Sequence, residues 1–331
     1  MNNTKTLQKH KLGLSGFLRN WAAALAVVLC LVIFTIARPT TFLTSDNIIT
    51  ILRSVSITCV LAMALTITLA VGGFDLAAGA LASVSGYFLM SFLLWHGWNF
   101  WLAMLVNIIL TMAIQCISMG LIIKCKIPDL LATCAMSFVL SGLGLTYTGG
   151  GAVSAGMNRP NGEPSVGSIP AIMGKIGSSP TIIIIMLACV LVCHVFLTYT
   201  KYGRYIYAVG GNKQAAKLSG IPVARYRFIA GMISAVFIAI AALLVVSRNS
   251  SAQIQAADGY QMPALAAVFI GRSVAGAEKP NAAGTLLGAL LVGILDNGLT
   301  MCGVPYYTLP AIKGLVLAVA LISAYISNKE D

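Results

Sequence analysis

Long apolar runs separated by short polar connections make up most of this chain of 331 residues. A helix needs about 20 residues to cross about 30 Å of hydrocarbon. On this criterion the pattern predicts an all-α, polytopic membrane bundle with about ten spans, forming one transmembrane domain over residues 1–331. The predicted spans cover residues 21–37, 54–71, 76–95, 98–123, 128–147, 180–200, 228–247, 262–271, 283–302 and 308–327.

Composition supports a membrane protein. Hydrophobic residues make up 58% of the chain and charged residues only 9%, whereas soluble domains carry about 25% charged residues. The formal net charge of +12 does not indicate a nucleic-acid partner, because the basic residues cluster at the ends of apolar runs. In that position they report the orientation of the spans.

Counting Lys and Arg in the connections predicts that both termini are cytoplasmic, since cytoplasmic loops carry the excess of basic residues. The tail 1–20 and the connection 201–227 then lie inside, and the interval 149–179 lies outside. Arg38-Pro39 after the first run is not a small-residue cleavage site, so this run is predicted to be an uncleaved span rather than a signal peptide.

The external interval 149–179 is rich in Gly, Ser, Pro and Asn, which favours a loop with short turns. A structured plug and a docking surface are the other interpretations. Five spans precede this interval and five follow it, which suggests the two-repeat construction common in transporters.

The stretch Gly72-Gly73-Phe74-Asp75 places an acid and two glycines between two apolar runs. A carboxylate inside a membrane is costly and is usually functional. Irregular backbone is tolerated at that depth only where protein or a water-filled cavity surrounds it. Gly72, Gly73 and Asp75 are therefore predicted to lie beside a solute pathway, the alternative being an interfacial acid at a wet turn.

The connection 201–227 contains a second informative stretch. Asn212 is a good N-cap, Gly220 suits the position after a helix end, and Pro222 stops a helix, so residues 213–219 are predicted to form a short helix between glycine hinges. One interpretation is a helix lying on the bilayer surface. The other is a docking helix for a cytoplasmic partner, with small Ala215 and Ala216 allowing close approach.

Two later stretches also carry polar groups into the membrane. Pro263 and Gly271 bracket a short apolar segment that suits a half-span, although a buried hairpin is also compatible with the pattern. Asp296 and Asn297 follow in the next run and are predicted to line the pathway. The alternative for Asp296 is an ordinary acid at a wet interface.

No enzyme signature is present. The sequence has no phosphate-binding Gly-x-x-x-x-Gly-Lys-Ser/Thr, no His-Glu-x-x-His and no Gly-x-Ser-x-Gly. Cys189 and Cys193 share a helix face, but His194 projects about 100° from Cys193, so no metal site is predicted. The eight cysteines lie mostly in apolar runs and behave as small hydrophobes. We expect no cofactor in this chain.

At these stretches the chain resembles the permease subunit of bacterial ATP-binding-cassette importers of the ribose and simple-sugar class. Three segments carry the resemblance: Gly72-Gly73-Phe74-Asp75-Leu76, the loop from Gly210 to Ile221, and the late span from Gly284 to Leu299. The resemblance implies an inner-membrane permease for a monosaccharide or similar small polar solute. It also implies three kinds of partner: a separate cytoplasmic ATP-binding subunit, a second permease copy or paralogue, and an external solute-binding protein.

The resemblance further implies that the loop 201–227 contacts the ATPase. The residues concerned are Gly211, Asn212, Ala215, Ala216, Leu218 and Gly220. Ala77-Ala78 stand where the family often has Ser-Val, and Gln261 stands where it often has Glu, which leaves the substrate open. A self-sufficient, proton-coupled secondary transporter is the alternative function, and a membrane enzyme has no nucleophile, metal site or acid–base pair in its favour.

Overall fold

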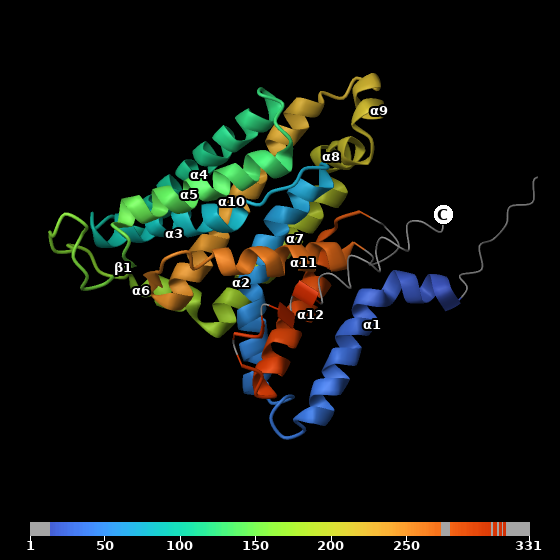
Figure 1. Ribbon diagram of the computed structural model, residues 1–331, viewed down its shortest axis with the longest axis horizontal. Coiled ribbons are helices and arrows are strands. Elements are labelled where there is room, and N and C mark those ends of the chain that lie inside the picture. Colours follow the sequence, from blue (N-terminus) through green and yellow to red (C-terminus); the bar gives the residue numbers. More distant parts are fainter. Residues whose placement is uncertain (1–13, 273–278, 306, 310, 313, 316–331) are drawn as a thin grey trace, which may run out of the picture.

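The computed structural model describes residues 14–272, 279–305, 307–309, 311, 312, 314 and 315. Nearly all of the ordered elements in this part of the chain are helices (Figure 1). Most of the predicted tail 1–20 and most of the predicted span 308–327 lie outside the described residues. The all-α membrane bundle expected from the sequence is confirmed.

Six described helices are long and apolar enough to cross a membrane. They are α2 (Ser45–Ala70), α4 (Phe100–Ile123), α5 (Asp129–Thr148), α7 (Ser179–Tyr199), α10 (Val223–Asn249) and α12 (Ala282–Met301). Two further helices match predicted spans, α1 (Leu14–Ala37) and the shorter α3 (Ala78–Leu94). Helix α2 begins well before residue 54 because Thr44 accepts the Asn47 N–H as an N-cap.

The predicted short segment at 262–271 is the helix α11 (Gln261–Gly271). Its 11 residues span only about 16 Å at 1.5 Å per residue, which is about half of the hydrocarbon thickness. A single 3₁₀ turn, η1 (Asp258–Tyr260), leads into it. The half-span interpretation therefore describes this segment better than a full span does.

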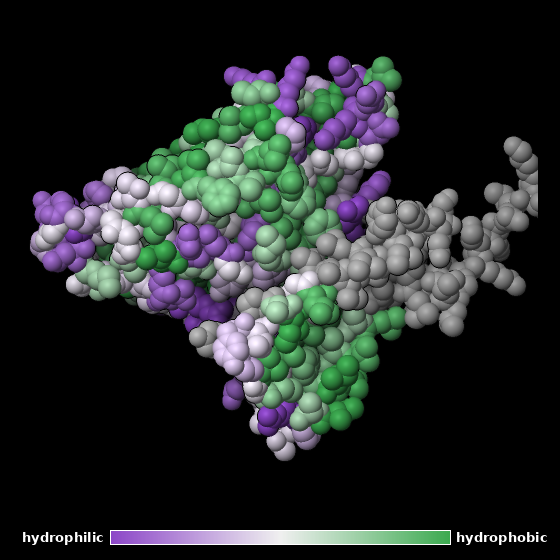
Figure 2. Space-filling view, in the orientation of Figure 1, coloured by the Kyte–Doolittle hydropathy of each residue, from purple (hydrophilic) through white to green (hydrophobic). Residues whose placement is uncertain are grey.

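Helices α2 and α10 form the centre of the bundle and pack against each other. Helices α7, α11 and α12 pack against α2, while α3, α4 and the short helix α6 (Ala171–Gly177) pack against α10. The outer faces of α4, α5 and α7 are apolar and exposed, as lipid contact requires. Figure 2 shows this apolar surface over α4 and α5, and a second apolar surface along α1.

Most of the interval 149–179 is irregular backbone with turns, as its composition favours, but it also contains strand β1 (Val153–Ser154) and helix α6 and is hydrogen-bonded to the bundle. Strand β1 pairs antiparallel with β2 (Ser251–Ala252). The Gly167 N–H donates to the Leu94 carbonyl at 2.7 Å, and Arg53 donates to the Gly177 carbonyl at 2.9 Å. We call this side of the molecule, with β1, β2 and α6, the ribbon end.

The connection 201–227 contains two helices at the opposite side of the molecule, which we call the loop end (Figure 1). Helix α9 (Lys213–Leu218) is the predicted short helix, and Ser219 is its C-cap. Helix α8 (Lys201–Gly211) was not predicted. Because Gly210 and Gly211 lie within α8, they do not form the hinge expected from the sequence.

Candidate functional site

The residues singled out in the sequence fall into three places. Asp296 and Asn297 lie at a pocket near the ribbon end. Gly72, Gly73 and Asp75 lie in the break at residues 71–77, between the end of α2 and the start of α3. The predicted coupling residues belong to α8, α9 and the turn that follows at the loop end.

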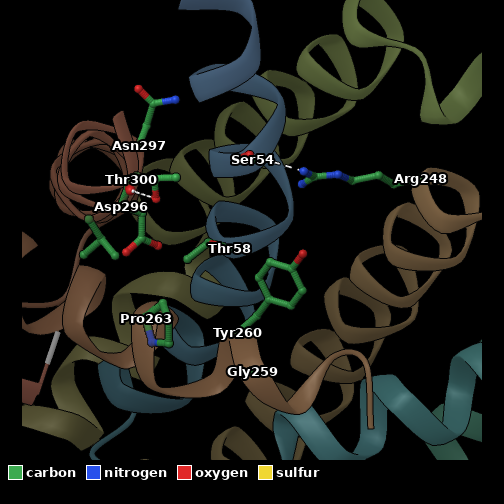
Figure 3. Close-up of a pocket in the computed structure, with 11 residues that line it drawn as sticks. Ser54, Thr58, Arg248, Gly259, Tyr260, Pro263, Asp296, Asn297 and Thr300 are labelled. Carbon is green, nitrogen blue, oxygen red and sulfur yellow. Dashed lines mark hydrogen bonds between the residues drawn. The ribbon is translucent and has the colours of Figure 1, made fainter. Parts of the chain in front are cut away.

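The pocket has a volume of about 430 Å³ and lies between α2, α11 and α12 (Figure 3). Pockets of roughly 300–1,000 Å³ are typical for small-molecule ligands. Its lining is mixed, with hydroxyl, amide, carboxylate and guanidinium groups beside small apolar residues. The lining residues are Ser54, Thr58, Arg248, Gly259, Tyr260, Pro263, Val292, Gly293, Asp296, Asn297 and Thr300.

Hydrogen bonds fix part of this lining. Arg248 at the end of α10 donates to the Ser54 hydroxyl at 3.4 Å, and the Thr300 hydroxyl donates to the Asp296 carbonyl at 2.7 Å. In Figure 3 the Asp296 carboxylate points into the space beside Thr58, whereas Asn297 extends away from it. Such a set of donors and acceptors suits a small solute rich in hydroxyl groups.

Asn297 lines the pocket and also makes a contact that the sequence did not predict. Its side-chain amide donates to the Asn47 Oδ1 atom on α2 at 2.9 Å. The bond joins two helices far apart in sequence, α2 and α12. Asn297 therefore holds the pocket wall, while the neighbouring Asp296 presents its carboxylate to the pocket.

The break at 71–77 has partners for most of its backbone N–H groups. Gly72 adopts φ +72°, a left-handed backbone conformation that favours glycine. The Gly73 N–H donates a hydrogen bond to the Thr68 carbonyl at 2.9 Å. The Leu76 N–H donates to the Thr133 hydroxyl at 3.1 Å. Protein groups thus satisfy irregular backbone that the membrane could not.

Asp75 is only 2% exposed and does not line the pocket. Its carboxylate accepts the Ala77 N–H at 2.9 Å and the Gln115 side-chain amide at 3.1 Å. Its backbone carbonyl accepts the Gln261 amide at 2.9 Å. These contacts give Asp75 a structural role in the break, and the sequence contained no signal for its contact with Gln261.

Helix α9 is stabilised at both ends by the residues expected. The Asn212 side chain accepts the N–H groups of Gln214 and Ala215 at 2.9 and 3.0 Å. After the helix Gly220 has φ +78°, and the Ile221 N–H donates to the Ala216 carbonyl, which is the Schellman pattern. This short helix therefore holds its shape at the surface of the loop end.

The two alanines of α9 face different ways. Ala216 is buried against the rest of the chain, whereas Ala215 is exposed and Leu218 is 90% exposed. An apolar side chain with this exposure on a rigid helix offers an anchor to another protein. A partner would thus contact Ala215 and Leu218, whereas Ala216 packs α9 against the rest of the chain.

The loop end and the break are in direct contact. A Cβ atom on Gly210 would lie 2.0 Å from the Ala70 carbonyl oxygen, and one on Gly72 would lie 3.3 Å from the Gly210 Cα atom. Gly203 makes a similar close approach to the Leu197 carbonyl. Gly203 and Gly210 are seven residues apart, so both lie on the same face of α8.

A second contact joins the loop end to the break. Arg227, in the first turns of α10, pairs with Asp129 at the start of α5, and the Phe74 N–H donates to the same carboxylate at 3.3 Å. The signal that could have revealed Asp129 is its position as a single acid opening an apolar run.

A third contact reaches α12. The Tyr207 hydroxyl of α8 donates to the Pro280 carbonyl, just before α12, at 2.8 Å. Burial raises the pKa of Tyr207 to about 12, so the hydroxyl stays protonated at neutral pH and remains the donor.

Within the described residues, no group of three His, Cys, Asp or Glu side chains could hold a metal ion. The cysteines at 189 and 193 are free and buried in α7.

Comparison with known proteins places this arrangement among transport proteins. The family model described as "Branched-chain amino acid transport system / permease component" matches residues 47–325. The chain is 30% identical over 328 residues to the ribose import permease protein of Escherichia coli (strain K12), covering 99% of both chains. It is 32% identical over 317 residues to the ribose import permease protein of Haemophilus influenzae, covering 95% of this chain and 96% of the relative.

A third relative, the xylose transport system permease protein of Escherichia coli (strain K12), is 26% identical over 349 residues, with 89% of each chain covered. No solved structure matches this chain.

Proposed function

Because the chain belongs to the family of branched-chain amino acid transport system permease components, we propose that it is the membrane-spanning subunit of an ATP-driven importer for a monosaccharide or a similar small polar solute. Permease components of this kind are not enzymes themselves, and we propose that ATP is hydrolysed in a separate chain. The relatives named for ribose and xylose import support a sugar as the solute.

The pocket at Asp296 is the observation that carries this proposal. It combines a carboxylate, a guanidinium group and several hydroxyl groups in a volume of about 430 Å³. Hydroxyl-rich solutes need donors and acceptors of this kind, and a few placed polar groups in a concave site fix their orientation. In this proposal Asp296 touches the passing solute and Asn297 holds the wall. The break at Gly72, Gly73 and Asp75 lies against the loop end and shapes the pathway without lining this pocket.

A polar pocket does not by itself couple transport to ATP. We therefore assign α9 to contact with the ATPase through Ala215 and Leu218. Asn212 and Gly220 cap this helix, and the buried Ala216 packs it against the bundle. Gly211, at the end of α8, belongs to the same contact. The same loop touches α2 and α12 through Gly210 and Tyr207, so a displacement of α9 would reach both helices.

For the topology we propose ten membrane segments in two groups of five, with α11 as a half-span among them, both termini in the cytoplasm of a bacterium and the chain in its inner membrane. The loop end is then cytoplasmic, and the ribbon end faces the solute-binding protein. A second permease copy or paralogue completes the pathway. Labelling of single introduced cysteines by a membrane-impermeant reagent tests this orientation, with a site in 149–179 expected to react from outside and a site in α9 only from inside.

Reconstitution tests the function. The chain is placed in liposomes with the ATPase and the solute-binding protein encoded beside it, and uptake of labelled ribose and xylose is measured. We expect uptake only with internal ATP and external binding protein. Uptake by the purified chain alone, driven by a pH gradient, would instead support the proton-coupled alternative.

A further inference from the structure

The Gln261 side chain is inserted into the backbone of the break. Its Nε2 atom donates to the Asp75 carbonyl at 2.9 Å, and its Oε1 atom accepts the Gly79 N–H at 2.7 Å. Residues 75 and 79 are four apart, so in an uninterrupted α-helix this N–H would bond to this carbonyl directly. The carboxamide of Gln261 thus takes the place of one helical hydrogen bond.

The surroundings allow this insertion. Gly79 has no side chain, and a Cβ atom there would lie 3.1 Å from the Gln261 Cβ atom. Gln261 is only 6% exposed. The segment before it is bonded to α3, because the Ala257 N–H donates to the Ser83 hydroxyl and that hydroxyl donates to Asp258. Residues 257–261 therefore pack against the start of α3 through several hydrogen bonds.

Asp75 is already arranged as the N-cap of a longer α3. In an N-cap the side chain accepts the N–H two or three residues later, and the carbonyl accepts the first intrahelical bond. The Asp75 carboxylate accepts the Ala77 N–H, which meets the first condition. The first intrahelical bond, from the Gly79 N–H to the Asp75 carbonyl, is missing because the Gln261 side chain is hydrogen-bonded to both groups.

We propose that Gln261 is a removable wedge that sets where α3 begins. With the wedge in place α3 starts at Ala78. When residues 257–261 move away from α3, the Gly79 N–H bonds to the Asp75 carbonyl, α3 gains about half a turn at its start, and the break shortens. Gln261 is thus a positioning residue, and this role rests on the proposed transport function.

The wedge lies between the two sites that transport must connect. Tyr260 and Pro263, on either side of Gln261, line the pocket. At the other end of the break, Gly72 contacts Gly210 of the cytoplasmic loop. A change in the pocket would therefore move the wedge, and the winding of α3 would move the contact with α8.

A side-chain variant tests the wedge. Gln261→Leu keeps a similar volume but can neither donate nor accept, and Gln253→Leu, at an exposed glutamine on the same segment, is the matched control. In the reconstituted importer we expect Gln261→Leu to lower maximal uptake about tenfold or more, which corresponds to about 1.4 kcal/mol. The concentration of loaded binding protein giving half-maximal uptake stays unchanged, and so does uptake by the control.

A cross-link tests the movement while leaving Gln261 and Asp75 intact. Ser83→Cys with Ala257→Cys places two thiols at the two positions that the present hydrogen bond joins, so a disulfide between them would hold residue 257 on α3. Oxidation is expected to stop uptake and reduction to restore it. Each single variant and the unmodified chain, oxidised in parallel, control for the native cysteines.

Full uptake with this cross-link formed, or full uptake by Gln261→Leu, would contradict the proposed role of Gln261. The proposed import function would not be affected by either result. Failure of the unmodified chain to import sugar with its partners would instead overturn the proposed function. If Gln261→Leu does not fold, the reversible cross-link alone decides the question.

Discussion

Arg227 and Asp129 form an ion pair that joins the end of the connection 201–227 to the break between α2 and α3. Both side chains are largely buried, with 16% and 18% of their surface exposed. The same Asp129 carboxylate accepts the Phe74 N–H. One acid therefore holds two parts of the chain that are 153 residues apart in sequence, Phe74 and Arg227.

Removing the arginine should leave the Asp129 charge without its partner. Arg227→Ala is expected to lower the free energy of unfolding by about 1–3 kcal/mol, less than for a fully buried pair because water still reaches both groups. Thermal unfolding in detergent measures this loss. Arg225→Ala, at an exposed arginine two residues away, is the control and should change little. Equal losses in the two variants would contradict the role of the pair.

Two neighbouring glycines of α8 offer a matched test of the contact with the break. A Cβ atom on Gly210 would collide with the Ala70 carbonyl, whereas one on Gly211 would meet nothing within 4 Å. Gly210→Ala should therefore displace α8 and lower uptake. Gly211→Ala should leave α8 in place or stabilise it by up to about 1 kcal/mol, because alanine favours a helix over glycine, so any loss of uptake in this variant would report the proposed contact of Gly211 with the ATPase instead. The prediction fails if both variants import sugar equally well.

ATP-dependent uptake should depend on the exposed face of α9, because this face is proposed to contact the ATPase. Leu218→Asp keeps the helix caps but replaces the apolar anchor by a charge, so ATP-dependent uptake should fall while membrane insertion and thermal stability stay unchanged. Lys217→Ala, on an exposed neighbour, is the control. Asn212→Ala tests the cap separately and should cost about 1 kcal/mol of local stability. Copurification of the ATPase with each variant measures the contact, and undiminished recovery with Leu218→Asp would exclude it.

Mutations can distinguish the role of Asp296 in the pocket from the role of the Asn297–Asn47 hydrogen bond in its wall. Asp296→Asn removes the carboxylate charge with little change in volume, and we expect it to raise the sugar concentration needed for half-maximal uptake. Asn297→Ala and Asn47→Ala should each reduce stability, and the double variant should lose little more than Asn47→Ala alone, because that variant already removes both the shared hydrogen bond and the Asn47 bond to the Phe42 carbonyl. Additive losses in this double-mutant cycle would show that the two residues act independently.

Much of the architecture follows from the sequence. Apolar runs of sufficient length predict the spans, and the short run between Pro263 and Gly271 predicts a half-length helix, since the length of a helix follows from the run itself. The caps of α9 were also readable, because Asn212 and Gly220 act on groups only two to five residues away. Each of these features depends on local backbone geometry.

The tertiary structure decided which of these features meet. The contacts of Gly72 with Gly210 and of Asp75 with Gln261 join residues 138 and 186 positions apart, and no periodicity or capping rule relates such positions. The inward face of Ala216 and the packing of the interval 149–179 likewise depend on the surfaces beside them. The sequence by itself therefore determined where most of the long helices lie and how α9 is capped, because these features follow from hydrophobicity and local hydrogen bonding. Only long-range packing could decide that the break, the pocket and the connection 201–227 are physically connected.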